Sequence, residues 1–428
     1  MARVEKRLSK GVLEMRGFFD KQQLEKTPYK SEKGTLSCVS CGLYKYVESP
    51  RMKPYGEFGK RIMVIGEGPG EDEDRKGRPW QGKMGRILQR KYQQLGIDLF
   101  EDCVSLNAVN CRPVDQKGNN KAPTEHEIAC CRQKVIDAIK QYQPKLIILQ
   151  GAAAISSVIT GYCWKTSRYN GINVWRGWTI PDRTLNTWIC PTFHPSFVER
   201  QESEGVVELI WTQDLERAFS KLGEPLPNYR DESECVVISF DIERVLKTIL
   251  KDKPRFLAFD IETTGLKSYN KENHRIVTIS FCYEEDRSYA IPFPTEEKQL
   301  RLLRHVLEHP DIGKIAANMK YEDNWMNFLH NIEVGPWVFD TMQAAHVLDN
   351  RPGITGLKFQ AYIRFGTPDY DSEVEPYLKS PDSNTPNRVM ELVRDETLFR
   401  KLLLYNGIDS LATYRLAMLQ MKELGFEL

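Results

Sequence analysis

Short apolar runs that end in turn residues recur through the first half of the chain. The run Arg61–Gly66, for example, leads into Glu67-Gly68-Pro69-Gly70. Apolar runs bounded by Gly, Pro or Asn are typical of buried strands. We predict strands at residues 61–66, 103–109, 145–151 and 187–193.

Amphipathic stretches separate these predicted strands. Thr124 and Glu127 form a capping box, which predicts the start of a helix. Strands that alternate with helices predict a doubly wound α/β domain with a parallel sheet. The apolar residues at helical spacing are Ile87, Leu88, Tyr92 and Leu95 in one helix, and Ile128, Cys131, Val135 and Ile139 in the other.

The second half has a different order of elements. We predict a helix at 240–250, a strand leading to Asp260, two hairpin-like strands at 276–283 and 289–292, and a helix at 296–307. A segment with two prolines and a run of charges precedes them and is typical of a linker. The expected organisation is an N-terminal helical segment at 1–30, domains at 31–222 and 237–428, and a linker at 223–236.

Length and charge narrow the functional classes. A chain of 428 residues suits two or three domains. The 60 basic and 59 acidic residues leave a net charge of +1, which excludes a globally basic nucleic-acid-binding protein and leaves only local patches for such contacts. Because no apolar run approaches the roughly 18 residues of a membrane span, we expect a cytoplasmic protein with no membrane partner.

Two carboxylates stand at the end of a predicted strand in the second half. Asp260 and Glu262 are two residues apart, so their side chains point to the same face. Carboxylates this close repel each other unless cations neutralise them, and oxygen ligands suit Mg²⁺ or Mn²⁺. A pair of such ions cleaves phosphodiesters in many enzymes. The alternative is a solvated strand end.

Two downstream motifs extend this acidic pair. The first is Asn318–Asp323 (NMKYED), and the second places Tyr405 and Asp409 on one helical face. Together with Phe339–Met342 and Gly356–Lys358, they resemble the proofreading 3′→5′ exonuclease domain of the DNA polymerase I family, over roughly residues 236 to 428.

This resemblance implies a ribonuclease H-like fold of the DnaQ type and a site with two Mg²⁺ or Mn²⁺ ions. It assigns Tyr405 to orienting the attacking water. Glu322 stands where the family usually has Asp, and Asp323 follows it. We favour Glu322, because it keeps the motif's position relative to Tyr321. The implied metal ligands are Asp260, Glu262, Glu322 and Asp409.

Cysteines form a second candidate site. Cys38 and Cys41 form a C-x-x-C in a predicted loop, Cys111 precedes Arg112-Pro113, and on the predicted helix Cys131 points inward while Cys130 lies about 100° around the axis. A C-x-x-C alone is compatible with redox chemistry, with zinc binding or with no function at all.

Ordered motifs connect these cysteines to a known family. Gly66–Gly70 (GEGPG), Gly77–Trp80 (GRPW), Asn107–Pro113 (NAVNCRP) and His194–Ser196 (HPS) resemble family 4 uracil-DNA glycosylases, and most nearly the glycosylase-like domain at the front of certain phage DNA polymerases. The resemblance implies a [4Fe-4S] cluster, which needs four thiolates. Zinc is the competing interpretation. The implied ligands are Cys38, Cys41, Cys111 and Cys131.

The same resemblance assigns a base-excision pocket. Trp80 would stack on the flipped base, Asn107 would read it, and His194 would stabilise the leaving uracil. The acidic loop, through Glu67 and Glu73, would stabilise the water or the oxocarbenium ion, and Gly68 would bring backbone close to the base. Three departures from the family leave activity open: Trp80 replaces Phe, Gln81 replaces an apolar residue and Gly68 replaces Ala.

The sequence therefore predicts a metal-dependent 3′→5′ DNA exonuclease that carries an iron-sulfur glycosylase-like domain. We find no acidic palm signature of a polymerase, so a polymerase domain or subunit of phage type is the expected partner, in the host cytoplasm. Single-stranded or frayed 3′ ends are the expected substrate. Two alternatives stay open: the first domain is a non-catalytic module that binds DNA or polymerase, or both domains act in uracil repair.

Overall fold

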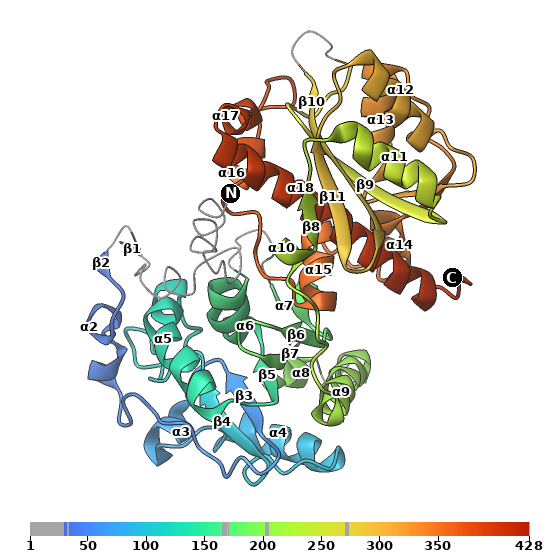
Figure 1. Cartoon of the computed structure of the whole chain (residues 1–428). Coiled ribbons are helices and arrows are strands. Elements are labelled where there is room, and N and C mark those ends of the chain that lie inside the picture. Colours follow the sequence, from blue (N-terminus) through green and yellow to red (C-terminus); the bar gives the residue numbers. More distant parts are fainter. Residues whose placement is uncertain are drawn as a thin grey trace, which may run out of the picture.

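A computed structural model describes residues 30–31, 34–164, 169, 171–201, 205–269 and 274–427. Apart from a strand pair near the start, these residues form two α/β units, one around a five-stranded sheet and one around a six-stranded sheet (Figure 1). The predicted N-terminal helix at 1–30 lies almost entirely outside the described residues. Among the described residues, no helix has both the length and the apolar character that crossing a membrane requires.

The first sheet has the strand order β4-β3-β5-β7-β6, in which only β6 is antiparallel to its neighbour. Side chains alternate along β3, so Met63 and Ile65 enter one core while Ile62 and Val64 enter another. Helices therefore cover both faces, and the doubly wound prediction is confirmed. The strands are β3 (Ile62–Gly66), β4 (Cys103–Asn107), β5 (Leu146–Gln150), β6 (Ile180–Asp182) and β7 (Thr187–Thr192).

The helices of this unit begin where the sequence indicates. The Thr124 hydroxyl accepts a hydrogen bond from the amide of Glu127, and the Glu127 carboxylate accepts one from the amide of Thr124, which confirms the capping box. The long helices are α4 (Lys83–Gln94), α5 (Glu125–Tyr142), α6 (Ala152–Val158) and α9 (Gly205–Ser220). The shorter elements are β1 (Lys30–Ser31), β2 (Gly34–Thr35), α2 (Cys38–Cys41), η1 (Leu43–Tyr46), α3 (Glu71–Lys76), η2 (Ile159–Cys163), α7 (Ile172–Trp175), α8 (Pro195–Arg200) and η3 (Lys221–Gly223).

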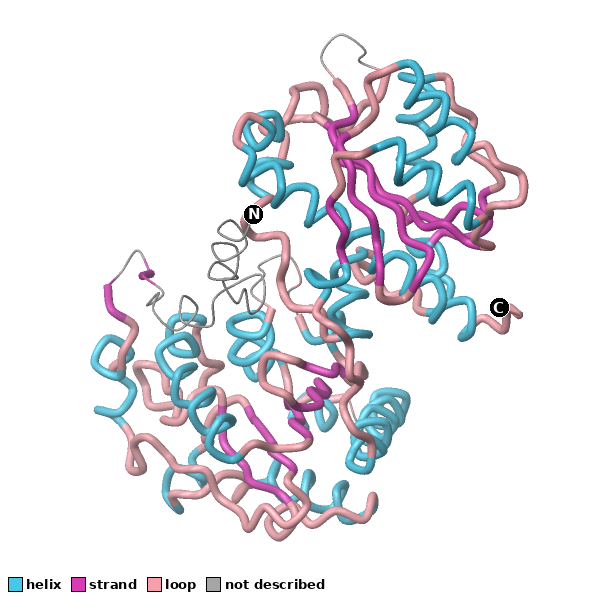
Figure 2. The backbone as a smooth tube through the Cα atoms, viewed as in Figure 1, coloured by secondary structure: helices cyan, strands magenta, loops and turns pink. Residues whose placement is uncertain are grey.

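The second sheet has the order β13-β12-β9-β10-β11-β8, with β9, β10 and β11 antiparallel and the outer strands parallel to their neighbours. Figure 2 shows this twisted sheet with helices on both sides. The strands are β8 (Val236–Ile238), β9 (Phe256–Thr263), β10 (Ile276–Glu284), β11 (Arg287–Pro292), β12 (Gly313–Ala316) and β13 (Trp337–Asp340). The helices are α10 (Glu232–Cys235), α11 (Ile242–Asp252), α12 (Glu297–Leu307), α13 (Met319–His330), α14 (Thr341–Leu348), α15 (Leu357–Phe365), α16 (Glu375–Leu378), α17 (Val389–Val393) and α18 (Glu396–Glu423).

Strand β9 separates two environments. Leu257, Phe259 and Ile261 pack under α11, α12 and α13, whereas Ala258 belongs to a cluster with α18. Helix α18 lies close to the sheet because it has no side chain at Gly407, where a Cβ would approach a methyl group of Val236 to 2.4 Å. The face of β9 that carries Ala258 therefore meets α18, and residues at the same spacing as Ala258 point toward that helix.

The segment between the units is tied down. Glu232, in α10, pairs with Arg183 of the first unit at 2.8 Å and with Arg415 of α18 at 3.2 Å. Glu232 lies in the predicted linker, Arg183 in the predicted first domain and Arg415 in the predicted second domain, so one carboxylate connects all three segments. The exact domain bounds remain a prediction.

Candidate functional site

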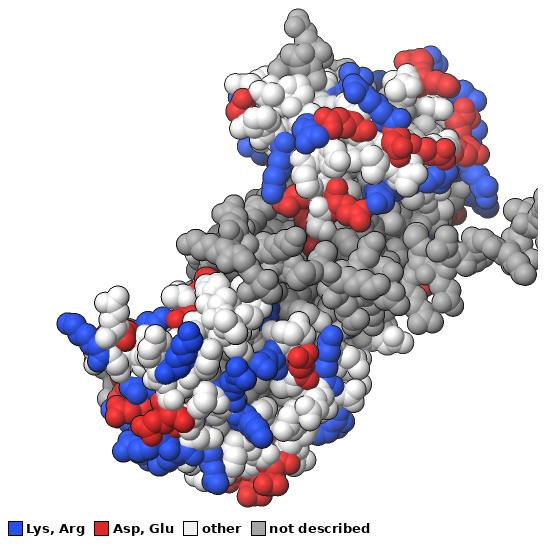
Figure 3. Space-filling view, turned by 90° about the vertical axis from the view of Figure 1, so that its left-hand side faces the viewer, with Lys and Arg blue, Asp and Glu red and all other residues white. Residues whose placement is uncertain are grey.

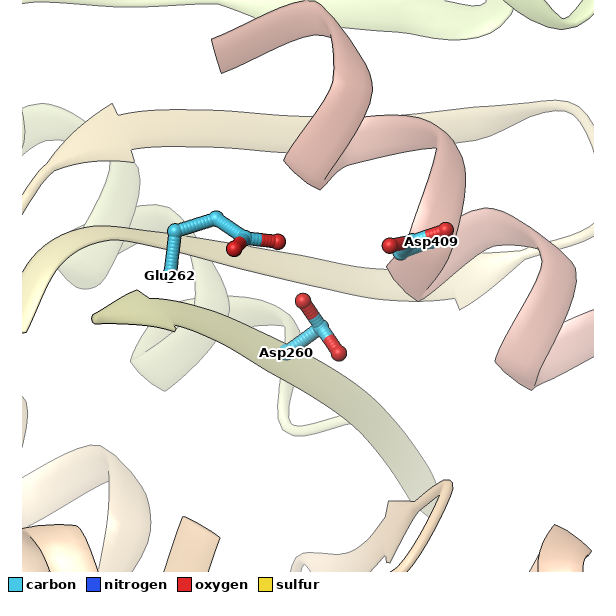
Figure 4. A group of neighbouring side chains, drawn as sticks. All are labelled: Asp260, Glu262 and Asp409. Carbon is cyan, nitrogen blue, oxygen red and sulfur yellow. The ribbon is translucent and has the colours of Figure 1, made fainter. Parts of the chain in front are cut away.

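Three carboxylates converge on the α18 face of the second sheet. Asp260 and Glu262 follow Ala258 at alternating positions of β9, and Asp409 comes from α18 (Figure 4). Their ligand oxygens lie within 4.8 Å of one another. The motif at Asp260 and Glu262 and the motif at Tyr405 and Asp409 predict such a site, in which a strand and a distant helix each supply carboxylates.

Burial makes the charges in this group costly. It raises the pKa of Asp260 and of Glu262 well above the ordinary values, and neighbouring carboxylates raise both further. Burial also raises the pKa of Asp409, while Lys358 and hydrogen bonds from Tyr370 and Tyr405 act against that rise. A divalent cation relieves such repulsion, and a set of carboxylate oxygens is its preferred environment.

Glu322 lies next to this group on α13. It is only 3% exposed, and its Oε2 is buried without a hydrogen-bond partner. Burial and then the charge of Asp260 raise its pKa well above the ordinary value. Asp323 is engaged elsewhere, since its Oδ1 accepts a hydrogen bond from Trp337 Nε1 at 3.1 Å. Glu322 is therefore the buried acid whose charge interacts with Asp260.

Asp340 fixes the start of α13 through hydrogen bonds to backbone amides. Asn318 has a left-handed backbone, with φ of 75°. The Asp340 carboxylate accepts hydrogen bonds at 3.0 Å from the amides of Asn318 and Met319, and another at 2.9 Å from Met342. Asp340 thereby holds two helix starts together and positions the first turn of α13, which carries Glu322.

Polar partners surround the carboxylates. Lys358 Nζ donates a hydrogen bond to the Tyr405 hydroxyl at 2.6 Å, and Asn406 Nδ2 donates one to Asp260 Oδ2 at 2.7 Å. The Tyr370 hydroxyl donates one to Asp409 Oδ1. Although burial acts in the opposite direction, the charges of Asp409, Asp371 and Glu262 raise the pKa of Lys358. Sequence reasoning gave no role to Lys358, Tyr370 or Asn406.

Four cysteines gather in the first unit. Cys38 and Cys41 lie in helix α2, which a Ser37–Ser40 capping box begins, so the prediction of a loop here is wrong. Burial, with a smaller contribution from the charges of Cys41, Cys111 and Cys38, raises the pKa of Cys131 to about 12. Cys130 has other hydrogen-bond partners: its Sγ lies 3.4 Å from Ser40 Oγ and 3.6 Å from His126 Nε2.

The spacing of these sulfurs bears on the group they fit. Among the described residues, no three cysteine sulfurs lie within 4.8 Å of one another. A tetrahedral zinc ion with bonds of about 2.3 Å would draw its sulfurs to roughly 4 Å apart. Four soft thiol donors suit an iron-sulfur cluster, and they equally suit a zinc ion whose binding draws the sulfurs together.

The glycosylase motifs meet at the end of β3. A Cβ on Gly66 would lie 2.5 Å from Asn107 Oδ1 and 2.9 Å from the Trp80 ring. The ring centroids of Trp80 and His194 are 5.7 Å apart. Trp80 is 6% exposed, and its indole nitrogen is buried without a hydrogen-bond partner.

His194 is held as a neutral ring. Its Nδ1 lies 2.8 Å from the Ser196 hydroxyl and accepts a hydrogen bond from the Ser196 amide at 3.2 Å. Burial, with the charge of Arg200, lowers its pKa to about 4. Because Nδ1 is committed to Ser196, Nε2 is the nitrogen left for a ligand.

Glu67 and Glu73 of the acidic loop have different environments. Burial raises the pKa of Glu67. Glu73 instead fastens the loop: its Oε1 accepts hydrogen bonds from the amides of Gln81 at 2.9 Å and Gly82 at 2.7 Å, and its Oε2 accepts one from Gly70 at 3.1 Å. Gly68 packs against the Pro113 ring, which a Cβ would meet at 3.1 Å.

Comparisons with known proteins divide the chain in the same way. Residues 53–219 match the uracil DNA glycosylase superfamily, and residues 234–422 match a family described as 3′-5′ exonuclease. The type-4 uracil-DNA glycosylase of Thermotoga maritima is 34% identical over 166 residues, which are 39% of this chain and 79% of that protein.

One relative spans both units. The DNA polymerase of Bacillus phage SP01 is 24% identical over 331 residues, which cover 70% of this chain and 34% of the polymerase. A solved structure of Brucella melitensis NrnC with bound Mg²⁺ is 18% identical, with a TM-score of 0.30 over 40% of this chain and 74% of that one. The chain thus belongs to the type-4 uracil-DNA glycosylase family through its first unit, and its second unit is a 3′-5′ exonuclease domain.

Proposed function

We propose that the second domain is a Mg²⁺- or Mn²⁺-dependent exonuclease that removes nucleotides from single-stranded or frayed 3′ ends of DNA. The observation that carries this proposal is the convergence of Asp260, Glu262 and Asp409 within 4.8 Å. The raised pKa values of these acids and the unpartnered Oε2 of Glu322 support a site built for cations.

The four acids would act as metal ligands. Asp260, Glu262, Glu322 and Asp409 would hold two metal ions. When bound, such ions would lower the pKa of a water and stabilise the charge on the leaving oxygen. The Tyr405 hydroxyl, fixed by Lys358, would orient that water in line with the terminal phosphodiester. The water oxygen would bond to phosphorus as the phosphorus–O3′ bond breaks. The water would give up a proton, the O3′ leaving group would take one up from solvent, and a nucleoside 5′-monophosphate would be released.

Charge on the surface is mixed. On the face drawn in Figure 3, basic and acidic side chains lie side by side over both units. No large patch of only basic or only acidic side chains is visible on this face, in agreement with the net charge of +1. We therefore expect the strand to be held mainly near the site, and the activity to fall only moderately as salt rises.

The test is a 3′-labelled oligonucleotide with Mg²⁺. The parent protein should release labelled mononucleotide, and Asp260→Ala should lower the rate at least a thousandfold while the melting temperature stays within a few degrees of the parent value. Chelation should stop the parent, and added Mn²⁺ should restore it. Release at the parental rate by Asp260→Ala would contradict the proposal.

For the first domain we propose a [4Fe-4S] cluster on Cys38, Cys41, Cys111 and Cys131. The likeness to type-4 uracil-DNA glycosylases and the influence of the charges of Cys41, Cys111 and Cys38 on the pKa of Cys131 support it. The cluster would pin α2 and the Cys111 loop to α5. Iron and sulfide analysis of anaerobically purified protein tests this directly, and stoichiometric zinc without iron would overturn it.

Uracil excision is a second candidate function. Asn107 and Trp80 meet beside Gly66, and the Trp80 ring neighbours the His194 ring, an arrangement that favours excision. Asn107 would hydrogen-bond the flipped base, Trp80 would stack on it, and His194 Nε2 would stabilise the departing uracil anion while Glu67 faces the sugar. Glu73 would act by fastening the loop.

Uracil-containing single strands followed by alkali test this second candidate. Strand breaks in the parent that disappear in Asn107→Ala and His194→Ala would support excision. Intact strands in the parent would favour a non-catalytic module that holds DNA. The likeness to a phage polymerase further supports a polymerase domain or subunit as the partner, in the host cytoplasm.

A further inference from the structure

Helix α15 belongs to the second domain by sequence but is part of the first domain's core. Phe359 and Tyr362 are almost fully buried in the cluster that contains Trp164 and Trp175. The Tyr362 ring stacks on Trp164 with centroids 5.3 Å apart and an angle of 10° between the planes, and the Phe359 ring lies 5.1 Å from Trp175. Figure 1 shows α15 between the two sheets.

Polar contacts fix both the face and the end of this helix. The Tyr362 hydroxyl donates a hydrogen bond to Asp182 Oδ2 at 3.0 Å. Arg183 Nε donates one to the Phe365 carbonyl, also at 3.0 Å. The helix ends at Gly366, with φ of 62°, so close to strand β6 that a Cβ would lie 1.8 Å from the Pro181 carbonyl oxygen.

A second contact lies just before α15. The Arg351 guanidinium donates hydrogen bonds to the carbonyls of Asn173 at 2.9 Å and Arg176 at 2.8 Å, both in the first domain. It also lies over the Trp178 ring, 4.9 Å from the centroid, and Arg364 of α15 lies 5.4 Å from the same centroid. Residues 351–366 are therefore attached to the first domain at both ends.

The same segment builds the wall of the exonuclease site. Lys358, one residue before Phe359, reaches the Tyr405 hydroxyl at 2.6 Å and pairs with Asp371 at 3.2 Å. Tyr370, four residues after Gly366, donates its hydroxyl hydrogen to Asp409. Lys358 and Tyr370, whose side chains contact Tyr405 and Asp409, thus stand in the same short segment as side chains that are buried in the other domain.

We propose that residues 356–371 are a structural element shared by the two domains, and that the glycosylase domain sets the geometry of the exonuclease site through it. This proposal rests on the proposed exonuclease function. Displacement of α15 from β6 would move Lys358 and Tyr370, which position Tyr405 and Asp409, while β9 and its carboxylates stay in place. The turnover number then depends on residues that never approach the substrate.

Gly366→Ala tests the proposal in the full chain. The added methyl group meets the Pro181 carbonyl, so α15 must shift. We expect kcat for 3′ release to fall at least tenfold while KM for the oligonucleotide changes less than threefold. The matched control is Gly56→Ala, which also has a positive φ, of 128°, and would place a Cβ 2.1 Å from the Cys103 carbonyl oxygen. It lies at β4, at the opposite edge of the first sheet from β6, and should keep kcat within twofold.

A second variant covers the case in which Gly366→Ala does not fold. Trp164→Leu lies wholly in the first domain and removes the ring beneath Tyr362. Hydrogen exchange should rise across 357–371, and kcat should fall at least fivefold. Faster exchange with kcat unchanged would overturn the proposal. The exonuclease function itself is tested separately: if the parent protein releases nucleotides no faster than Asp260→Ala does, that function fails.

Discussion

The ammonium group of Lys358 lies 2.6 Å from the hydroxyl oxygen of Tyr405 and 4.6 Å from the centre of its ring. Lys358 is also the cation that acts against the high pKa of Asp409. A single side chain thus fixes the hydroxyl assigned to the attacking water and stabilises a neighbouring carboxylate.

Lys358→Met should lower kcat by about 10- to 100-fold, since a charge-assisted hydrogen bond contributes about 1.5–3 kcal/mol. Single-turnover release at saturating Mg²⁺ measures this. Lys358→Arg keeps a cation and a donor and should recover part of the rate. Equal rates in the Met variant and the parent would remove Lys358 from the site.

Glu322 and Asp323 form a matched pair for the third acidic position. Glu322→Gln should lower the rate at least a hundredfold, because the buried carboxylate beside Asp260 loses its charge. Asp323→Asn keeps an oxygen for Trp337 and should retain nearly full activity. The Mn²⁺ concentration needed for half-maximal rate distinguishes them, and the reverse pattern would assign the metal ligand to Asp323.

Glu262→Gln should stabilise the metal-free protein at neutral pH even as it abolishes activity. Burial and the charges of Asp260 and Asp409 raise the folded-state pKa of Glu262, so its ionised form opposes folding. The penalty applies fully above the folded pKa, shrinks as pH falls, and vanishes below the unfolded value of about 4.5.

Thermal unfolding in EDTA measures this effect. The variant should melt higher than the parent at pH 8, and the two should converge near pH 4.5. Millimolar Mg²⁺ should stabilise the parent more than the variant, because only the parent keeps the full ligand set. If the variant melts lower than the parent in EDTA at pH 8, the ionised Glu262 carboxylate does not destabilise the folded protein.

Cys131→Ser and Cys130→Ser test the cluster with adjacent residues. The first should remove at least half of the bound iron and its visible absorbance, since Cys131 faces the other three thiols. The second should leave iron unchanged, because Cys130 faces Ser40 and His126. Equal loss from both would mean that the helix, rather than one thiol, is needed for assembly.

Much of the fold follows from local pattern. The run at 61–66 becomes β3 at Ile62–Gly66, and the Thr124 box begins α5. Both succeed because strand alternation and helix capping are decided by neighbouring residues. The pairing of Asp260 with Glu262 on one face follows from the same alternation.

The remaining features depend on contacts that no local pattern encodes. Tyr370 reaches Asp409 from an irregular stretch 39 residues away along the chain. Glu73 resembles a catalytic acid by position, but three backbone amides occupy its oxygens. The apolar face of α15 predicts burial, yet nothing in its spacing shows that the face belongs to the other domain.

The aromatic face of α15 bears on how such a chain can be recombined. Exchange of the first 220 or so residues for an unrelated glycosylase would leave Phe359 and Tyr362 facing water at the junction. Chimeras joined in the 223–236 segment would then aggregate unless the incoming partner supplied a matching aromatic cavity. Lineages that shuffle these modules are expected to move them as a pair.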